Sequence, residues 1–251
     1  DYNINKLFYT LVLLVTFSCE QEDAWGCIQT SGAPVVQELI VDPFETILVN
    51  RDIELVVKQG LNYKVEIQTG ENLLDSIEVI VTDNQLQLTD PNSCNFVRDY
   101  GLTKMIVTTP VLKEIRSSTQ YLTSSEGILN FETLTLVSED YKTDYLSSGD
   151  FNLTVDTQSL KVVANNLSIF TISGFTESVS VFFASGICAF KAADLIAQDV
   201  TIFQRSSHDI IVNPQQSLKV DIRSVGDVIS IHRPPVVEVQ EFYTGRLLFL
   251  D

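Results

Sequence analysis

Four carboxylates, Glu139, Asp140, Asp144 and Asp150, gather in consecutive predicted loops and have the most obvious chemical potential in this chain. Carboxylate oxygens bind Ca²⁺, and a carboxyl group can also exchange protons with a substrate. Such a cluster would suit an enzyme that holds Ca²⁺ and acidifies the α-proton of a sugar, as polysaccharide lyases do. A solvated acidic surface is the competing interpretation.

A lyase would also need a positioned Lys or Arg as its base. The central part of the chain offers only Lys142, Lys161 and Lys191, and Lys161 alternates with the apolar Leu160 and Val162 as an outward residue should. The acidic surface is therefore the favoured interpretation. We assign no catalytic residue and no metal ligand, and we keep a polysaccharide-active enzyme as the alternative.

The adjacent pair His208-Asp209 invites a general-base interpretation, in which the carboxylate fixes the imidazole tautomer. Adjacent residues of a strand face opposite sides, however, so in a strand the two side chains cannot cooperate. No nucleophile motif accompanies the pair. His232 is interpreted as a residue at a strand end.

The four cysteines lie at positions 19, 27, 94 and 188. If Cys19 is acylated, Cys27 and Cys94 are the natural disulfide pair in an oxidising compartment, and closing that loop would stabilise the fold by roughly 4 kcal/mol. Cys188 is expected to be a small buried hydrophobe. No C-x-x-C spacing exists, so no zinc site and no cofactor are predicted.

The first residues of the chain predict an address. Residues 7–17 are almost entirely apolar but too few for the roughly 20 residues of a spanning helix, as in a signal peptide. The small Ser18 then precedes Cys19, as in a lipobox, and acylation of Cys19 would hold the protein at a membrane surface. We predict a signal peptide over 1–18 and a tether over 19–34; an ordinary cleaved signal with Cys19 as a free thiol is the alternative.

Composition indicates one folded domain. Residues 35–251 contain no linker-like segment, and 45% of the chain is hydrophobic. Sixteen Lys and Arg against 33 Asp and Glu give a net charge of −17, which would repel phosphate backbones. No nucleic-acid partner is expected.

Apolar residues recur with a period of two from residue 35 to residue 88, which predicts strands of an antiparallel or edge-capping region. Residues 71–77 are the best candidate for a brief helical turn. Beyond Pro110 an apolar-x-apolar triplet repeats, and successive anchors are 22, 26, 19, 21 and 18 residues apart. The anchors are Leu112, Leu134, Leu160, Val179, Val200 and Leu218.

A second short strand follows each anchor after eight to eleven residues, usually behind small turn residues. Repeats of about 20 residues made of short strands and turns are typical of a β-solenoid, in which each repeat packs on its neighbours. A β-sandwich is the rival fold. We predict an all-β, parallel β-helix, with caps over residues 35–88 and 234–251.

The middle repeats are rich in phenylalanine, and most of these side chains are expected in the core. Phe182 and Phe183 are adjacent, so one of them should point to solvent. An exposed ring on a long flat face would be suited to contact a glycan.

Several segments, in this order, resemble the family called putative auto-transporter adhesin, head GIN domain, over residues 44–235. They are residues 53–60, 71–75, 92–98, 107–115 and 243–247. The resemblance implies a right-handed single-stranded parallel β-helix with an N-terminal strand-rich cap, an exported location and no known catalytic residues. The acidic residues 20–23 also resemble the export signal of Bacteroidetes-type surface lipoproteins, although they would serve equally as a solvated tether.

The sequence therefore predicts a lipid-anchored protein of the outer membrane or cell surface. Its expected role is adhesin-like binding or scaffolding without catalysis. The expected partners are the membrane, through Cys19, and a glycan or a surface protein.

Overall fold

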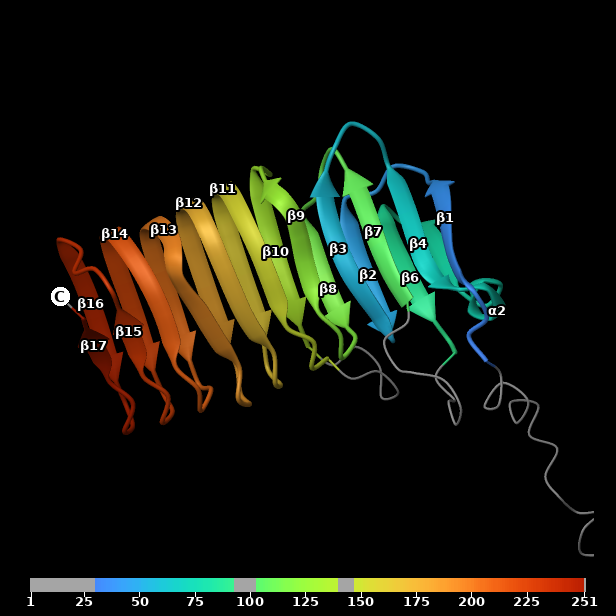
Figure 1. The fold of residues 1–251 in the computed structure, drawn as a ribbon. Helices are drawn as coiled ribbons and strands as arrows, with labels where there is room; N and C mark the ends of the chain where they lie inside the picture. The colour runs from blue at the N-terminus through green and yellow to red at the C-terminus, as the bar shows by residue number, and fades with distance from the viewer. Residues whose placement is uncertain (1–29, 93–102, 140–146, 251) are drawn as a thin grey trace, which may run out of the picture.

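The period-two alternation produces strands throughout most of the chain (Figure 1). The computed structural model describes residues 30–92, 103–139 and 147–250. Its seventeen strands belong to one mixed, mostly parallel sheet that curls into a half-barrel. The elements in order are β1 (Pro34–Ile40), β2 (Thr46–Arg51), β3 (Ile53–Gln59), β4 (Lys64–Gly70), α2 (Glu71–Leu74), β5 (Glu78–Thr82), β6 (Gln85–Asp90), β7 (Thr103–Thr109), β8 (Glu114–Ser118), β9 (Thr123–Leu129), β10 (Thr133–Ser138), β11 (Phe151–Ala164), β12 (Ile169–Phe183), β13 (Ala189–Gln204), β14 (Ile210–Ile222), β15 (Val228–Ser230), β16 (Val236–Glu241) and β17 (Leu247–Phe249).

The predicted repeats pair with one another in parallel and in register. Leu134 lies opposite Leu160, Leu160 opposite Val179, and the same register continues through Val200 to Leu218. We call this row of strands the first ladder. It comprises β6, β2, β8, β10, the second halves of β11 to β14, and β16.

The second ladder comprises β7, β3, β9, the first halves of β11 to β14, β15 and β17. The sequence predicted separate short strands, but β11 to β14 are continuous strands of 13 to 16 residues. The first half of each of these strands pairs within the second ladder, and its second half pairs within the first ladder, where it begins the next repeat. The backbone stays extended at the corner between the ladders, so no turn interrupts the strand there.

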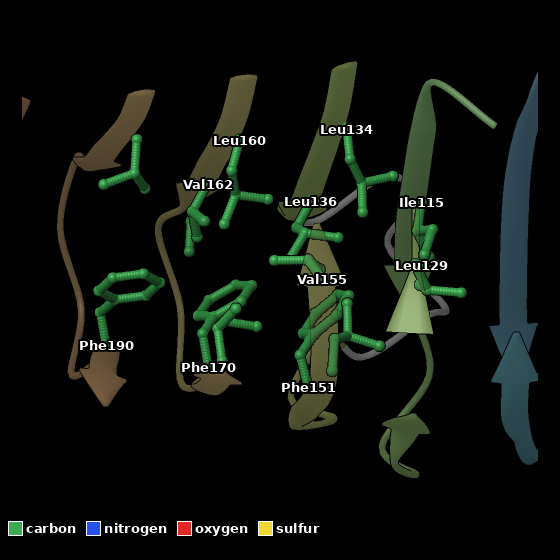
Figure 2. Packing of buried hydrophobic residues seen from close by; sticks show 14 of the residues in the cluster. Ile115, Leu129, Leu134, Leu136, Phe151, Val155, Leu160, Val162, Phe170 and Phe190 are labelled. Carbon is green, nitrogen blue, oxygen red and sulfur yellow. The ribbon is translucent and has the colours of Figure 1, made fainter. Parts of the chain in front are cut away.

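The core lies inside the curled sheet, where like residues of successive repeats stack (Figure 2). Phe151 lies opposite Phe170 and Phe170 opposite Phe190, and none of the three is more than 1% exposed. The rings of Phe151 and Phe170 stack with centroids 4.6 Å apart. Full burial of one such side chain contributes about 1.5–3 kcal/mol.

The N-terminal region is more than a cap, which corrects the prediction for residues 35–88. β2 and β3 are parallel members of the ladders, with β6 and β7 on one side and β8 and β9 on the other. The chain therefore forms the inner repeat of β2 and β3 first and the outer repeat of β6 and β7 next. It then returns to the other side of β2 and β3 to form β8 and β9. Among the described strands, β1 and β4 extend β7 in antiparallel pairs and β5 extends β6 in the same way, so these three strands close this end of the sheet.

The C-terminal tail is also not a cap. β16 and β17 continue the parallel pairing onto β14 and β15, because the residues after Pro234 keep the apolar alternation of the repeats. They form the last repeat at the far end of the sheet from β1 and α2 (Figure 1). Across the described ranges, no helix is long and apolar enough to cross a membrane.

Candidate binding surface

The adjacent phenylalanines separate as the strand alternation requires. Phe183 is fully buried at the end of β12, whereas Phe182 is 42% exposed on the solvent side of the first ladder. Phe203 lies opposite Phe182 in the next repeat and is half-buried. One predicted outward ring is thus confirmed.

Phe182 and Phe203 begin a row of side chains that crosses four successive repeats. Their rings stack with centroids 4.7 Å apart and planes 15° apart. The guanidinium of Arg223 lies 5.6 Å from the centre of the Phe203 ring and 4.5 Å from that of Phe242. We call these four residues the aromatic strip.

Arg223 is held in place within the strip by the carboxylate of Asp221, two residues before it in the chain. Its Nε and Nη2 donate to the two carboxylate oxygens of Asp221 at 2.9 and 3.0 Å. This hydrogen bonding raises the pKa of Arg223. The planar guanidinium therefore extends the stacked rings while its charge is balanced by Asp221.

A shallow hollow lies at the corner between the ladders. It has a volume of about 340 Å³ and is lined by Asn130, Phe131, Asp156, Phe175 and Glu177, with three further corner residues. A second hollow of about 220 Å³ shares Asn130 and Phe131. In the part of the chain that the structure describes, no group of His, Cys, Asp or Glu could hold a metal ion, so these carboxylates do not assemble a cation site.

The predicted acidic cluster is only partly described, because Asp140, Asp144 and Lys142 lie outside the described residues. Glu139 faces Arg116, with its Oε2 3.7 Å from Nη1. Asp150 accepts a hydrogen bond from the backbone N–H of Ile169 at 2.9 Å. Glu139 therefore forms an ion pair, and Asp150 forms a hydrogen bond to the next repeat.

His208 and Asp209 lie in the turn before β14 and not in a strand, which corrects the premise of the sequence argument. Asp209 accepts the backbone N–H of Asp227 at 2.9 Å, and His208 is exposed. Asp227 in turn accepts the N–H of Arg246 at 2.7 Å. Sequence reasoning missed this turn-closing role, although an acidic residue directly before Phe151, Ile210 and Val228 was a visible signal.

Most of the cysteine predictions concern residues that the structure does not describe. Cys19, Cys27 and Cys94 are not among the described residues, so acylation and the disulfide remain predictions. Cys188 is fully buried and free, as expected for a small hydrophobe. Burial raises the pKa of its thiol to about 11, so the group is neutral and unreactive near neutral pH.

A family model described as "Putative auto-transporter adhesin, head GIN domain" matches residues 43–234, nearly the range expected from the sequence. The chain belongs to this family. The stacked repeats and the aromatic strip up to Arg223 lie within the matched range of the head GIN domain. Phe242 and the last repeat lie beyond it.

Solved structures of low identity share the fold of this head GIN domain. A putative adhesin from Bacteroides fragilis matches with a TM-score of 0.78 and 19% identity, covering 88% of this chain and all of that one. A putative adhesin from Parabacteroides distasonis has a TM-score of 0.62 and 12% identity, covering 88% and 99%. A putative lipid binding protein from the same species matches with a TM-score of 0.60 and 15% identity, covering 87% of this chain and 94% of that one. No curated protein matches the chain.

Proposed function

We propose that this protein is an exported, lipid-anchored adhesin of the outer membrane or cell surface that binds neutral glycans through the aromatic strip and catalyses no reaction. Family membership supports a surface-exposed adhesin. The lipobox at Cys19 supports the anchor. In this proposal the curled sheet is a right-handed single-stranded β-helix that serves as a rigid support for the strip.

The aromatic strip is the observation that carries the binding proposal. Exposed rings on a monomeric surface usually mark an interaction site when they are contiguous. The C–H face of a sugar ring packs well on an aromatic ring, and stacked rings at successive repeats offer such contacts in a row. A chain of sugars laid along the strip would contact several repeats at once.

Charge restricts the class of glycan. Arg223 is balanced by Asp221, and the whole chain carries a charge of −17. A polyanionic polysaccharide would be repelled by this field, whereas a neutral one would not. Neutral polysaccharides are therefore the expected ligands.

The proposal is tested by measuring retention of the full-length protein on neutral and anionic polysaccharides, with mass spectrometry of the sugars for new chain ends. Phe182→Ala and Phe203→Ala should each weaken binding to a neutral polysaccharide about tenfold, which corresponds to about 1.4 kcal/mol. Thr201→Ala, an exposed change on the same side of β13, is the matched control and should bind normally.

If Phe182→Ala binds as tightly as the wild type, the aromatic strip is not the glycan-binding site. New unsaturated chain ends would instead favour the polysaccharide-active enzyme. The described carboxylates give that enzyme little support, because Glu139 and Asp150 already have structural partners.

A further inference from the structure

The last repeat has the apolar residues of a core but no neighbour to cover them. Val237 lies opposite Leu218 and Val239 opposite Val220, so both point to the inside of the sheet. Leu218 and Val220 are 1% and 2% exposed, whereas Val237 and Val239 are 36% and 45% exposed. Val237 and Val239 thus occupy core positions by their register, but no described strand packs over them.

The same end exposes an unusual share of the apolar surface. Of the 19 large hydrophobic side chains that are exposed in the described residues, seven belong to the last sixteen residues of the chain. They are Val236, Val237, Val239, Phe242, Tyr243, Leu248 and Leu250. Val237 and Val239 are the members that face the open core, and exposed apolar surface of this kind marks an interaction site.

The strand edges at this end are also available. β16 pairs with β14, β17 pairs with β15, and no described strand covers their outer edges. Both ladders stop at the same repeat, so the end is level (Figure 1). The opposite end is stepped, because two antiparallel strands, β4 and β1, extend the second ladder while β5 alone extends the first.

Charge and shape point to a second copy of this chain as the occupant. Residues 231–250 contain Arg233 and Arg246 against Glu238 and Glu241, so this segment is neutral in a chain of charge −17. Two copies of this neutral segment would not repel each other when they meet, although each chain as a whole is strongly acidic. A level end matches a second level end, whereas it does not match the stepped one.

We propose that two copies meet end to end through their last repeats in a symmetric dimer. Each copy would cover the open core positions of the other, including Val237 and Val239. This arrangement places the two N-terminal ends at opposite ends of the dimer. If Cys19 anchors each copy, as proposed above, the dimer can join two membranes, and the protein would then be a self-recognising adhesin.

The dimer itself is tested without any membrane. The 251-residue chain carrying Cys19→Ser, which removes the predicted acylation site, is examined by light scattering over a range of concentrations. Its mass should rise from 28.0 kDa to twice that value. Val239→Lys should stay monomeric, because it places like charges in the interface and occupies a position that is already exposed. Ile196→Lys, a change at a 47% exposed residue of β13, is the matched control and should still dimerise.

A wild-type protein that stays monomeric, a dimer that Val239→Lys does not affect, or an assembly that grows beyond two copies would each overturn the proposed interface. Hydrogen exchange gives an independent check, since the backbone amides of β16 should become protected as the protein concentration rises. The glycan test uses Phe182 and Phe203, which lie on β12 and β13 and outside the last repeat, so failure of the dimer is distinguishable from failure of the proposed function.

Bridging is tested separately with acylated protein on vesicles of phosphatidylethanolamine and phosphatidylglycerol. The wild type should cluster the vesicles, and Val239→Lys should bind them without clustering. Protein that binds vesicles and dimerises but leaves them dispersed would overturn the bridging role while leaving the dimer intact.

Discussion

At the scale of single residues, aspartates in three of the turns before the second ladder connect one repeat to the next. Asp150, Asp209 and Asp227 each accept a backbone N–H from the following repeat. An unpaired N–H at the start of a strand would otherwise depend on water. Asp150 and Asp209, which the sequence offered as candidates for acid–base chemistry, therefore have a structural role in the described part of the chain.

Asp227→Ala should lower the free energy of unfolding by about 1 kcal/mol, because the N–H of Arg246 loses its charged acceptor. Asp227→Asn should recover most of the loss, since an amide oxygen can accept the same hydrogen bond. Urea unfolding of the two variants measures the difference. Equal losses in both would show that the hydrogen bond is not the cause.

At the scale of the strand, the close approach of β11 and β12 depends on a glycine. Gly174 has a φ of +107°, and a Cβ at this position would lie 2.0 Å from the carbonyl oxygen of Val155. Because that oxygen belongs to the backbone of a buried parallel strand, it cannot move aside cheaply.

Gly174→Ala should therefore destabilise the protein by about 3 kcal/mol or more, from the contact and the backbone conformation together. Gly127→Ala is the matched control, because Gly127 also has a positive φ, +81°, but nothing lies within 4 Å of its Cβ position. It should lose only about 1 kcal/mol. Thermal unfolding compares them, and similar losses would mean that the contact with Val155 relaxes.

The elements also show what the sequence could and could not predict. The anchors from Leu134 to Leu218 stack in the predicted order because period-two patterning and a regular repeat length together specify register. The position of β2 and β3 inside the ladders was not predictable, since their alternation is the same in a cap as in a repeat. Phe182 was found because adjacent residues must diverge, but Arg223 was not, because its place in the strip depends on pairing between distant segments.

At the scale of the whole molecule, the first strand of the sheet and the proposed binding surfaces lie at opposite ends. β1, which follows the predicted tether, is at one end of the sheet, and β16 and β17 are at the other (Figure 1). The aromatic strip runs over β12, β13 and the segments that follow β14 and β16. A protein held by Cys19 would thus present its strip and its open last repeat away from its own membrane.

This arrangement makes the anchor separable from the fold. Cys19 precedes β1, the first strand of the sheet, so Cys19→Ala should leave the unfolding transition unchanged while removing the acyl chains that the sequence predicts at this residue. Each buried CH₂ of those chains contributes roughly 0.8 kcal/mol, so their loss should move the protein from the membrane fraction to the soluble fraction on ultracentrifugation. Mass spectrometry of the wild type should find acyl groups on an N-terminal Cys19. Wild-type protein without that modification, or a Cys19→Ala variant that stays with the membrane, would contradict the lipid anchor, and the presentation of the strip would then need another means of attachment.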